Sequence, residues 1–165
     1  MKKLRLLITE KCNRSCSGCC NKQRDLNTLP ICNSYEGYKE IILTGGEPML
    51  NPNHVVYLIH NIRKETRGGT PIYLYTAKVD NVQGVLSVLY FLDGMTVTVH
   101  EEKDWDYVSR LNMLLPNNCR KSLRLNVFKD ANLHSYDQFV KWKVKDSIEW
   151  IKNCPLPTSE VLMKL

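Results

Sequence analysis

Short runs of apolar and β-branched residues alternate along the chain with stretches in which apolar residues recur every three or four positions. Short apolar runs favour buried strands, whereas the wider spacing is typical of helices that bury one face. The pattern predicts helices over residues 51–68, 82–89, 104–115 and 136–140. It predicts strands over residues 4–9, 39–44, 71–77, 95–100, 123–128 and 148–151.

Local signals mark the ends of some of these elements. Asn51 and Pro52 favour a helix start, because Asn can cap free amides and Pro tolerates the first helical position. Gly68 favours the end of that helix. Residues 21–38 are rich in turn formers and predict an irregular loop, and the residues after Pro155 predict a tail.

About six strands separated by helices indicate an α/β fold with parallel strands and right-handed crossovers. A closed eight-stranded barrel needs about 250 residues, or 200 at the least, and this chain has 165. The pattern therefore leaves an open barrel or an open doubly wound sheet. The length predicts a single domain over residues 1–165.

Composition narrows the class of protein. With 43% hydrophobic and 24% charged residues, the chain can form a globular core. The first apolar run is too short for a secretory or membrane segment, which predicts a cytoplasmic protein without a membrane partner. The net charge of +6 comes from scattered residues without an aromatic and basic stacking motif, so it favours a solvated surface over a nucleic-acid site.

Three cysteines follow the first predicted strand. Cys12, Cys16 and Cys19 form a C-x3-C-x2-C pattern, and soft thiolate ligands at such spacing favour an iron–sulfur cluster or zinc. A zinc site usually has four protein ligands, and Cys20 or Cys32 could supply the fourth. The chain has seven cysteines, but a cytoplasmic location predicts no disulfide framework.

A glycine pair follows the second predicted strand. Gly45, Gly46, Glu47 and Pro48 lie at the carboxyl end of that strand, where α/β folds bind ligands. Paired glycines allow a ligand to approach the backbone closely, although such pairs are also common in ordinary turns.

The cysteine pattern followed by this GGEP sequence resembles the radical S-adenosylmethionine family. The resemblance implies an α/β fold with a partial (βα)6-type open barrel and a [4Fe-4S] cluster on Cys12, Cys16 and Cys19. It implies that S-adenosyl-L-methionine binds the fourth iron, with its amino group held by the loop at residues 45–48. An external one-electron reductant of the flavodoxin or ferredoxin type would drive cleavage to a 5′-deoxyadenosyl radical, which abstracts hydrogen from a substrate.

The resemblance extends more loosely to the later strands. It implies further cofactor contacts from Thr76, Thr98, His100 and Asn126, all near the carboxyl ends of predicted strands. Strand propensity alone also explains Thr98, and a lone histidine such as His100 is often purely structural. The remaining cysteines, Cys32, Cys119 and Cys154, are most simply small buried residues, and Cys20 a bystander.

Several reactions remain open within this family. Gly18, which precedes the third cysteine, resembles the activating enzymes of anaerobic ribonucleotide reductase, whose substrate is a glycyl-radical protein. The alternative is similarity to 7-carboxy-7-deazaguanine synthase, which would imply a small-molecule substrate and magnesium. From a different class, the chain could be a noncatalytic metal-binding or electron-transfer module, although that leaves the GGEP sequence without a role.

Overall fold

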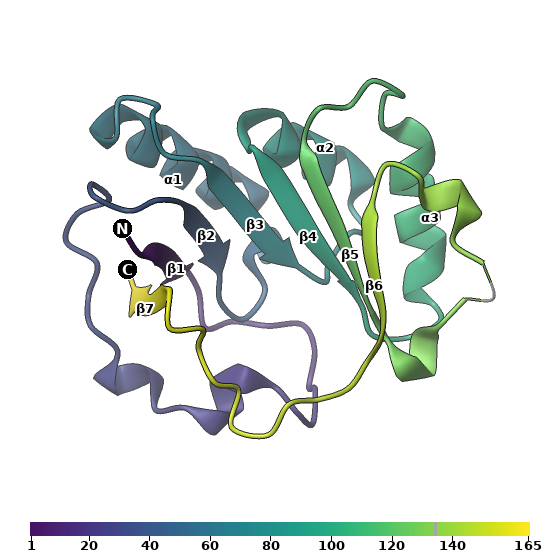
Figure 1. Ribbon diagram of the computed structural model, residues 1–165, viewed down its shortest axis with the longest axis horizontal. Helices are drawn as coiled ribbons and strands as arrows, with labels where there is room; N and C mark the ends of the chain where they lie inside the picture. Colours follow the sequence, from purple (N-terminus) through teal and green to yellow (C-terminus); the bar gives the residue numbers. More distant parts are fainter. Residues whose placement is uncertain (134) are drawn as a thin grey trace.

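Residues 1–133 and 135–165, which the computed structural model describes, form one sheet of seven parallel strands and three α-helices (Figure 1). The sheet order is β6-β5-β4-β3-β2-β1-β7. The helices are α1 (Pro52–Glu65), α2 (Val82–Phe91) and α3 (Asp104–Leu114). The strands are β1 (Lys3–Leu7), β2 (Ile41–Thr44), β3 (Ile72–Thr76), β4 (Gly94–Val99), β5 (Ser122–Phe128), β6 (Lys143–Ile148) and β7 (Glu160–Lys164).

The helices cover one face of the sheet. The first six strands are neighbours in the order of the sequence, so each right-handed crossover returns on the same side. Figure 1 shows α1, α2 and α3 together on that side. The core between helices and sheet contains fully buried residues from every layer, among them Leu6, Leu43, Ile59, Leu74, Val97, Leu111 and Leu125.

The described residues place no helical layer on the opposite face of the sheet, and we call it the open face. Because successive strand residues point to opposite faces, its side chains are those that alternate with the core residues. One register row runs across it from Tyr75 through Thr96 and Arg124 to Lys143. Parallel sheets usually have both faces covered, so a polar row on an uncovered face is unusual.

The helices begin and end where the sequence predicts within a few residues. Asn51 caps α1 by accepting a hydrogen bond from the His54 amide at 3.1 Å, and Pro52 occupies the first turn. The helix ends at Glu65, shortly before Gly68, whose φ of 76° continues the turn. None of the helices in the described part of the chain has the length and apolar composition that a membrane span requires.

The C-terminal third differs from the predictions. The helix expected over residues 136–140 is only a 3-10 turn, Asp137–Phe139, and the last predicted strand lies earlier, at Lys143–Ile148. The predicted tail is wrong as well, because β7 pairs in parallel with β1 over five positions and so becomes an outer strand of the sheet. Long-range pairing with a buried neighbour decides this strand, and local sequence pattern does not reveal it.

Residues 149–159 connect β6 to β7, and we call them the strap. Both strands are parallel to the rest, so the strap must return from the carboxyl ends of the strands to the side where β7 begins. Figure 1 shows it passing beside the 3-10 turns of residues 20–28 and bringing the C-terminus next to the N-terminus.

Candidate functional site

The candidate site is the edge of the sheet at which the strands end. Because the strands are parallel, the loops that follow them start at the same edge, where α/β proteins commonly bind ligands. We call this region the rim and define it as residues 8–19, 45–48, 76–78 and 100–104. All three candidate cluster cysteines and the GGEP sequence belong to it.

The GGEP loop packs directly on the start of the cysteine loop. The Gly46 amide donates to the Thr9 carbonyl at 2.6 Å, and the Glu47 amide donates to the Lys11 carbonyl at 2.8 Å. A Cβ atom on Gly46 would lie 2.1 Å from the Lys11 carbonyl oxygen, and one on Gly45 would lie 2.3 Å from that of Thr9. The glycine pair is therefore required for contact between the two loops, whatever else it binds.

The Glu47 carboxylate joins β2 to β3. Its side chain is buried, with 2% of the residue exposed. One oxygen accepts from the Met49 amide at 2.9 Å and from the Thr76 hydroxyl at 2.5 Å, and the other accepts from the Ala77 amide at 2.9 Å. Pro48 begins a 3-10 turn directly after it. Both Glu47 and Thr76, predicted to contact a cofactor, thus hold the rim together.

The three motif cysteines lie in one loop as free thiols. Cys12 is exposed, whereas Cys16 and Cys19 are partly buried. Burial raises the pKa of Cys16, and the negative charges of Cys19 and Cys12 raise it further. In residues 1–133 and 135–165, no three His, Cys, Asp or Glu side chains are gathered closely enough to hold a metal ion.

Arg14, inside the cysteine motif, anchors this loop to α3. Its guanidinium donates to Asp104 at 2.5 Å and to the Ala77 carbonyl at 3.2 Å. The second Asp104 oxygen accepts the amides of His100 and Glu101, at 3.0 and 3.2 Å. Burial lowers the pKa of Arg14, but the hydrogen bond and charge of Asp104 outweigh it and raise the pKa overall. The pair fixes the cysteine loop against the ends of β3 and β4.

An aromatic cluster closes the rim on the side of the open face. The His100 ring stacks on Phe128 and on Trp150 of the strap, with centroids 4.7 and 5.4 Å apart. Its Nδ1 atom is buried and has no hydrogen-bond partner among the described residues. Burial lowers the pKa of His100, and the charge of Arg14 lowers it further, against the opposing charge of Asp104. His100 is therefore a neutral ring at neutral pH.

Trp150 also explains Gly18. A Cβ atom on Gly18 would lie 2.5 Å from Cγ and Cδ2 of the Trp150 ring, so no larger residue fits there without a shift. The glycine before the third cysteine thus has a packing reason that is independent of the identity of any substrate.

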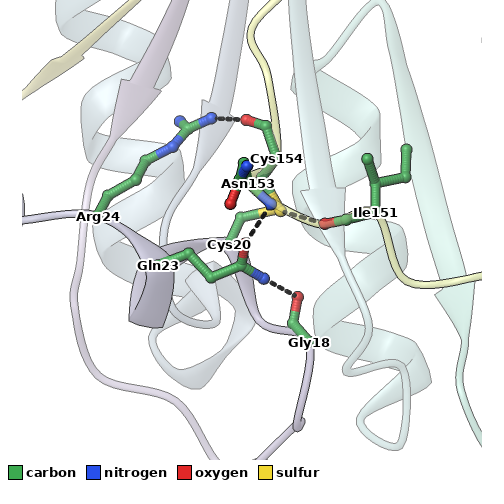
Figure 2. Close-up of a disulfide and its surroundings, with 7 residues drawn as sticks. All are labelled: Gly18, Cys20, Gln23, Arg24, Ile151, Asn153 and Cys154. Atoms are coloured by element: carbon green, nitrogen blue, oxygen red, sulfur yellow. Dashed lines mark hydrogen bonds between the residues drawn. A yellow bond between two sulfur atoms is a disulfide. The ribbon is translucent and has the colours of Figure 1, made fainter.

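A disulfide between Cys20 and Cys154 joins the strap to the cysteine loop, with Cα atoms 5.5 Å apart (Figure 2). Figure 2 shows the supporting contacts: Gln23 accepts the Asn153 amide at 2.7 Å, and Arg24 donates to the Cys154 carbonyl. This disulfide was not expected, and the prediction of Cys20 as a bystander is wrong. Cys154 is buried, as predicted, but it is bonded to Cys20 and so is not a simple apolar residue. The two cysteines are 134 residues apart, so only the fold brings them together.

The remaining predicted residues lie on or near the open face. Thr98 and Asn126 are register partners on β4 and β5, one row before His100 and Phe128. Cys32 and Cys119, expected to be buried, are only partly buried and pack against the edge of the core. The roles of Thr98, Asn126 and Pro48 as ligand contacts stay predictions.

Sequence reasoning missed Arg14, Asp104 and Trp150. Arg14 lies within the motif, and an aspartate that begins a helix is a recognisable signal, but their pairing spans 90 residues. Trp150 carries no local signal, because its partners come from three other segments.

No protein-family model, no curated protein and no solved structure matches this chain.

Proposed function

We propose that this chain is a radical S-adenosylmethionine enzyme that carries a [4Fe-4S] cluster on Cys12, Cys16 and Cys19. The observation that carries the proposal is the docking of the two motif loops at the ends of β1 and β2. Two backbone hydrogen bonds, from the amides of Gly46 and Glu47, join the loops directly. This contact brings together at one site two motifs, each of which alone is weak evidence for a cofactor site.

The topology supports the same proposal. Six sequentially adjacent parallel strands with helices on one side agree with a partial (βα)6-type open barrel, in which the uncovered face would be the interior. The open face would then hold the substrate, and the rim would hold the cofactors. This division agrees with the general location of active sites at the carboxyl ends of parallel strands.

The residue types at the rim suit the proposed group, although among the described residues the three thiols are not gathered closely enough to hold a metal, so cluster binding would have to draw them together. Three free thiols in one loop supply the soft ligands that such a cluster needs and leave one iron for a ligand from outside the protein. The buried, unpartnered Nδ1 of His100 marks a polar position that a bound molecule could satisfy. Backbone carbonyls of residues 45–47 and the side chains of Thr98 and Asn126 remain the candidate contacts to S-adenosylmethionine.

When bound, the cluster and S-adenosylmethionine would supply, after one-electron reduction, a 5′-deoxyadenosyl radical that abstracts hydrogen. The protein's own residues would position and shield this chemistry. Arg14 and Asp104 hold the cysteine loop in place, and Glu47 fixes the GGEP loop to β3. Trp150 of the strap packs over His100 and Gly18 and would limit access of water to the rim.

The two classes of substrate to be compared are a glycyl-radical protein and a small molecule. Gly18 is weaker evidence for a glycyl-radical activase than its place in the motif indicates, because the Trp150 ring leaves no room for a larger residue there. The strap also covers part of the rim that a large protein partner would have to reach. We therefore favour a small-molecule substrate, of the 7-carboxy-7-deazaguanine synthase type or another, over a glycyl-radical protein.

The test is anaerobic reconstitution with iron and sulfide, followed by reduction with dithionite in the presence of S-adenosylmethionine. We expect about four irons per chain and formation of 5′-deoxyadenosine. Cys12→Ala, Cys16→Ala and Cys19→Ala should each lose the cluster, whereas Cys119→Ala, a control at another free cysteine, should retain it. An intact cluster in any of the first three variants would refute the ligand assignment.

The competing candidate is a noncatalytic metal-binding module. One equivalent of zinc without cleavage of S-adenosylmethionine would support it, with the fourth ligand coming from Cys32 or, after reduction of the disulfide, from Cys20. Cleavage would exclude it, since a structural zinc site has no redox chemistry.

A further inference from the structure

Three cations gather on the open face of β5 and β6. Arg124 pairs in register with Lys143, and Lys145 lies two residues further along β6, opposite Asn126. All three cations are exposed. Neighbouring parallel strands are about 4.8 Å apart, so the Arg124 and Lys143 side chains start close together on the same face. Like charges in such a position repel each other and destabilise the sheet slightly.

No acidic residue within the described chain neutralises this cluster. Arg124, Lys143 and Lys145 take part in none of the ion pairs formed by residues 1–133 and 135–165. The carboxylates of the open face are already engaged: Glu40 with Lys3 and Glu160 with Arg5, both at 2.6 Å. The exposed Asp146 follows Lys145, where the register of β6 against β5 shifts. Even if its charge is counted, the three cations leave the cluster with a net positive charge.

Hydroxyl groups extend the cationic row across the sheet. Tyr75 and Thr96 precede Arg124 in the same register row, and these residues together with Tyr73 and Ser122 line a hollow on this face. Glu40 also lines the hollow, but its carboxylate is paired with Lys3. Thr96 is only 5% exposed, so the accessible part of the row is Tyr75, Arg124 and Lys143. A hydroxyl, a guanidinium and an ammonium in one row are groups that recognise a carboxylate or phosphate.

We propose that the accessible part of this row, Tyr75, Arg124 and Lys143, binds the anionic group, a carboxylate or a phosphate, of a small elongated molecule. From Arg124 to Phe128 the strand advances four residues, about 13 Å. An anion held at the row therefore directs the other end of a molecule of about that length toward His100 and the rim. Identification of this molecule as the substrate rests on the proposed function, whereas binding of the anion does not.

Edge lysines that merely keep strands from aggregating are the competing explanation, since β6 is an outer strand. They would not require a hydroxyl on the inner strand β3, nor an arginine in the same row. Solvated lysines would also bind anions weakly and without preference for one position.

The test is calorimetric titration of the full chain, prepared without iron, at low ionic strength. Inorganic pyrophosphate and citrate are the two probes, and they distinguish a phosphate from a carboxylate. We expect saturable binding of at least one probe at one site per chain. Arg124→Gln and Lys143→Gln should each weaken that binding by about tenfold, the effect of losing a charged hydrogen bond.

The matched control is Arg110→Gln on the exposed side of α3, which forms no ion pair with the described residues. It should leave the affinity unchanged. Absence of saturable binding of both probes, or an equal loss in Arg110→Gln, would overturn the proposal. Binding of a single-stranded RNA that tightens with its length, in place of either small probe, would also overturn it.

The two proposals fail separately. Anion binding is measured without cluster or reductant, and cleavage of S-adenosylmethionine is measured on the reconstituted wild-type chain without the probe. Cleavage of S-adenosylmethionine without anion binding would refute only the proposed anion site. Anion binding without cleavage would refute only the proposed reaction.

Discussion

The rim and the open face both carry polar side chains, but these side chains differ in burial and in hydrogen bonding. At the rim, Glu47 and Asp104 are buried, and both oxygens of each carboxylate accept hydrogen bonds from the protein. On the open face, the cations of Arg124 and Lys143 face each other without a carboxylate partner among the described residues. Satisfied polar groups stabilise and position a site, and unsatisfied ones are available to a ligand.

This difference changes the interpretation of the GGEP sequence. A motif residue such as Glu47 would ordinarily be assigned to ligand binding, yet its oxygens are occupied by Met49, Thr76 and Ala77. The contact of the motif with a cofactor would come from its backbone. Polar residues outside any motif, Arg124 on β5 and Lys143 on β6, form no ion pair with the other described residues and so keep free hydrogen-bonding capacity.

The largest expected effect comes from breaking the rim at Glu47. Glu47→Ala removes the acceptor of the buried Met49 amide and Thr76 hydroxyl and of the half-buried Ala77 amide, so we expect a loss of about 3–5 kcal/mol in the free energy of unfolding. Thr76→Val removes one of those donors and the acceptor of the Lys78 amide, and should cost about 1–2 kcal/mol. Urea denaturation of both variants measures the difference. Equal effects would show that the carboxylate does not join β2 to β3.

Removal of the disulfide should have the next largest effect. Cys154→Ser opens a cross-link between residues 134 positions apart, which we expect to cost about 2–4 kcal/mol in the oxidised protein. Wild-type protein treated with dithiothreitol should unfold like the variant, and the control Cys119→Ser should keep the response to reductant. An oxidised wild type that is no more stable than Cys154→Ser would exclude the bridge.

His100 should contribute a smaller, pH-dependent effect. Its pKa in the folded chain lies below the ordinary value of 6.5 because burial disfavours the charged ring. Above that value both states are neutral and the contribution is constant; as the pH falls below it, the unfolded chain takes up the proton first and stability decreases. His100→Phe, which preserves the stacking, should lack this part of the decrease in urea denaturation between pH 7 and about pH 5.

The smallest effect on stability should come from the open face. Arg124→Gln removes one partner of a like-charge pair and should change the free energy of unfolding by less than about 0.5 kcal/mol in either direction. The same variant is the one expected to weaken anion binding. A large loss of stability on thermal or urea unfolding would mean that Arg124 belongs to the structural group of polar residues, like Glu47.

The fold was predictable where local pattern and tertiary structure agree. The strands β1 to β5 and helices α1 to α3 have buried apolar residues at regular spacing, and Asn51 and Pro52 mark a helix start. The prediction was wrong for residues 136–140 and for β7. A polar outer strand such as Lys143–Ile148, with four exposed charged and polar residues, has little periodic signal of its own.

The sequence by itself determined the candidate chemistry: the cysteine spacing in one loop, the glycine pair in the next and the strand order that places both at one edge. These are local features, set by residue type and by positions close in the chain. Only the tertiary structure decided which polar groups are hydrogen-bonded within the protein and which are free to bind a ligand. It also brought Cys20 to Cys154, placed Trp150 against Gly18, and aligned cations from distant parts of the sequence in one row. Such contacts join segments far apart in the sequence, and burial and register, which fix them, exist only in the folded chain.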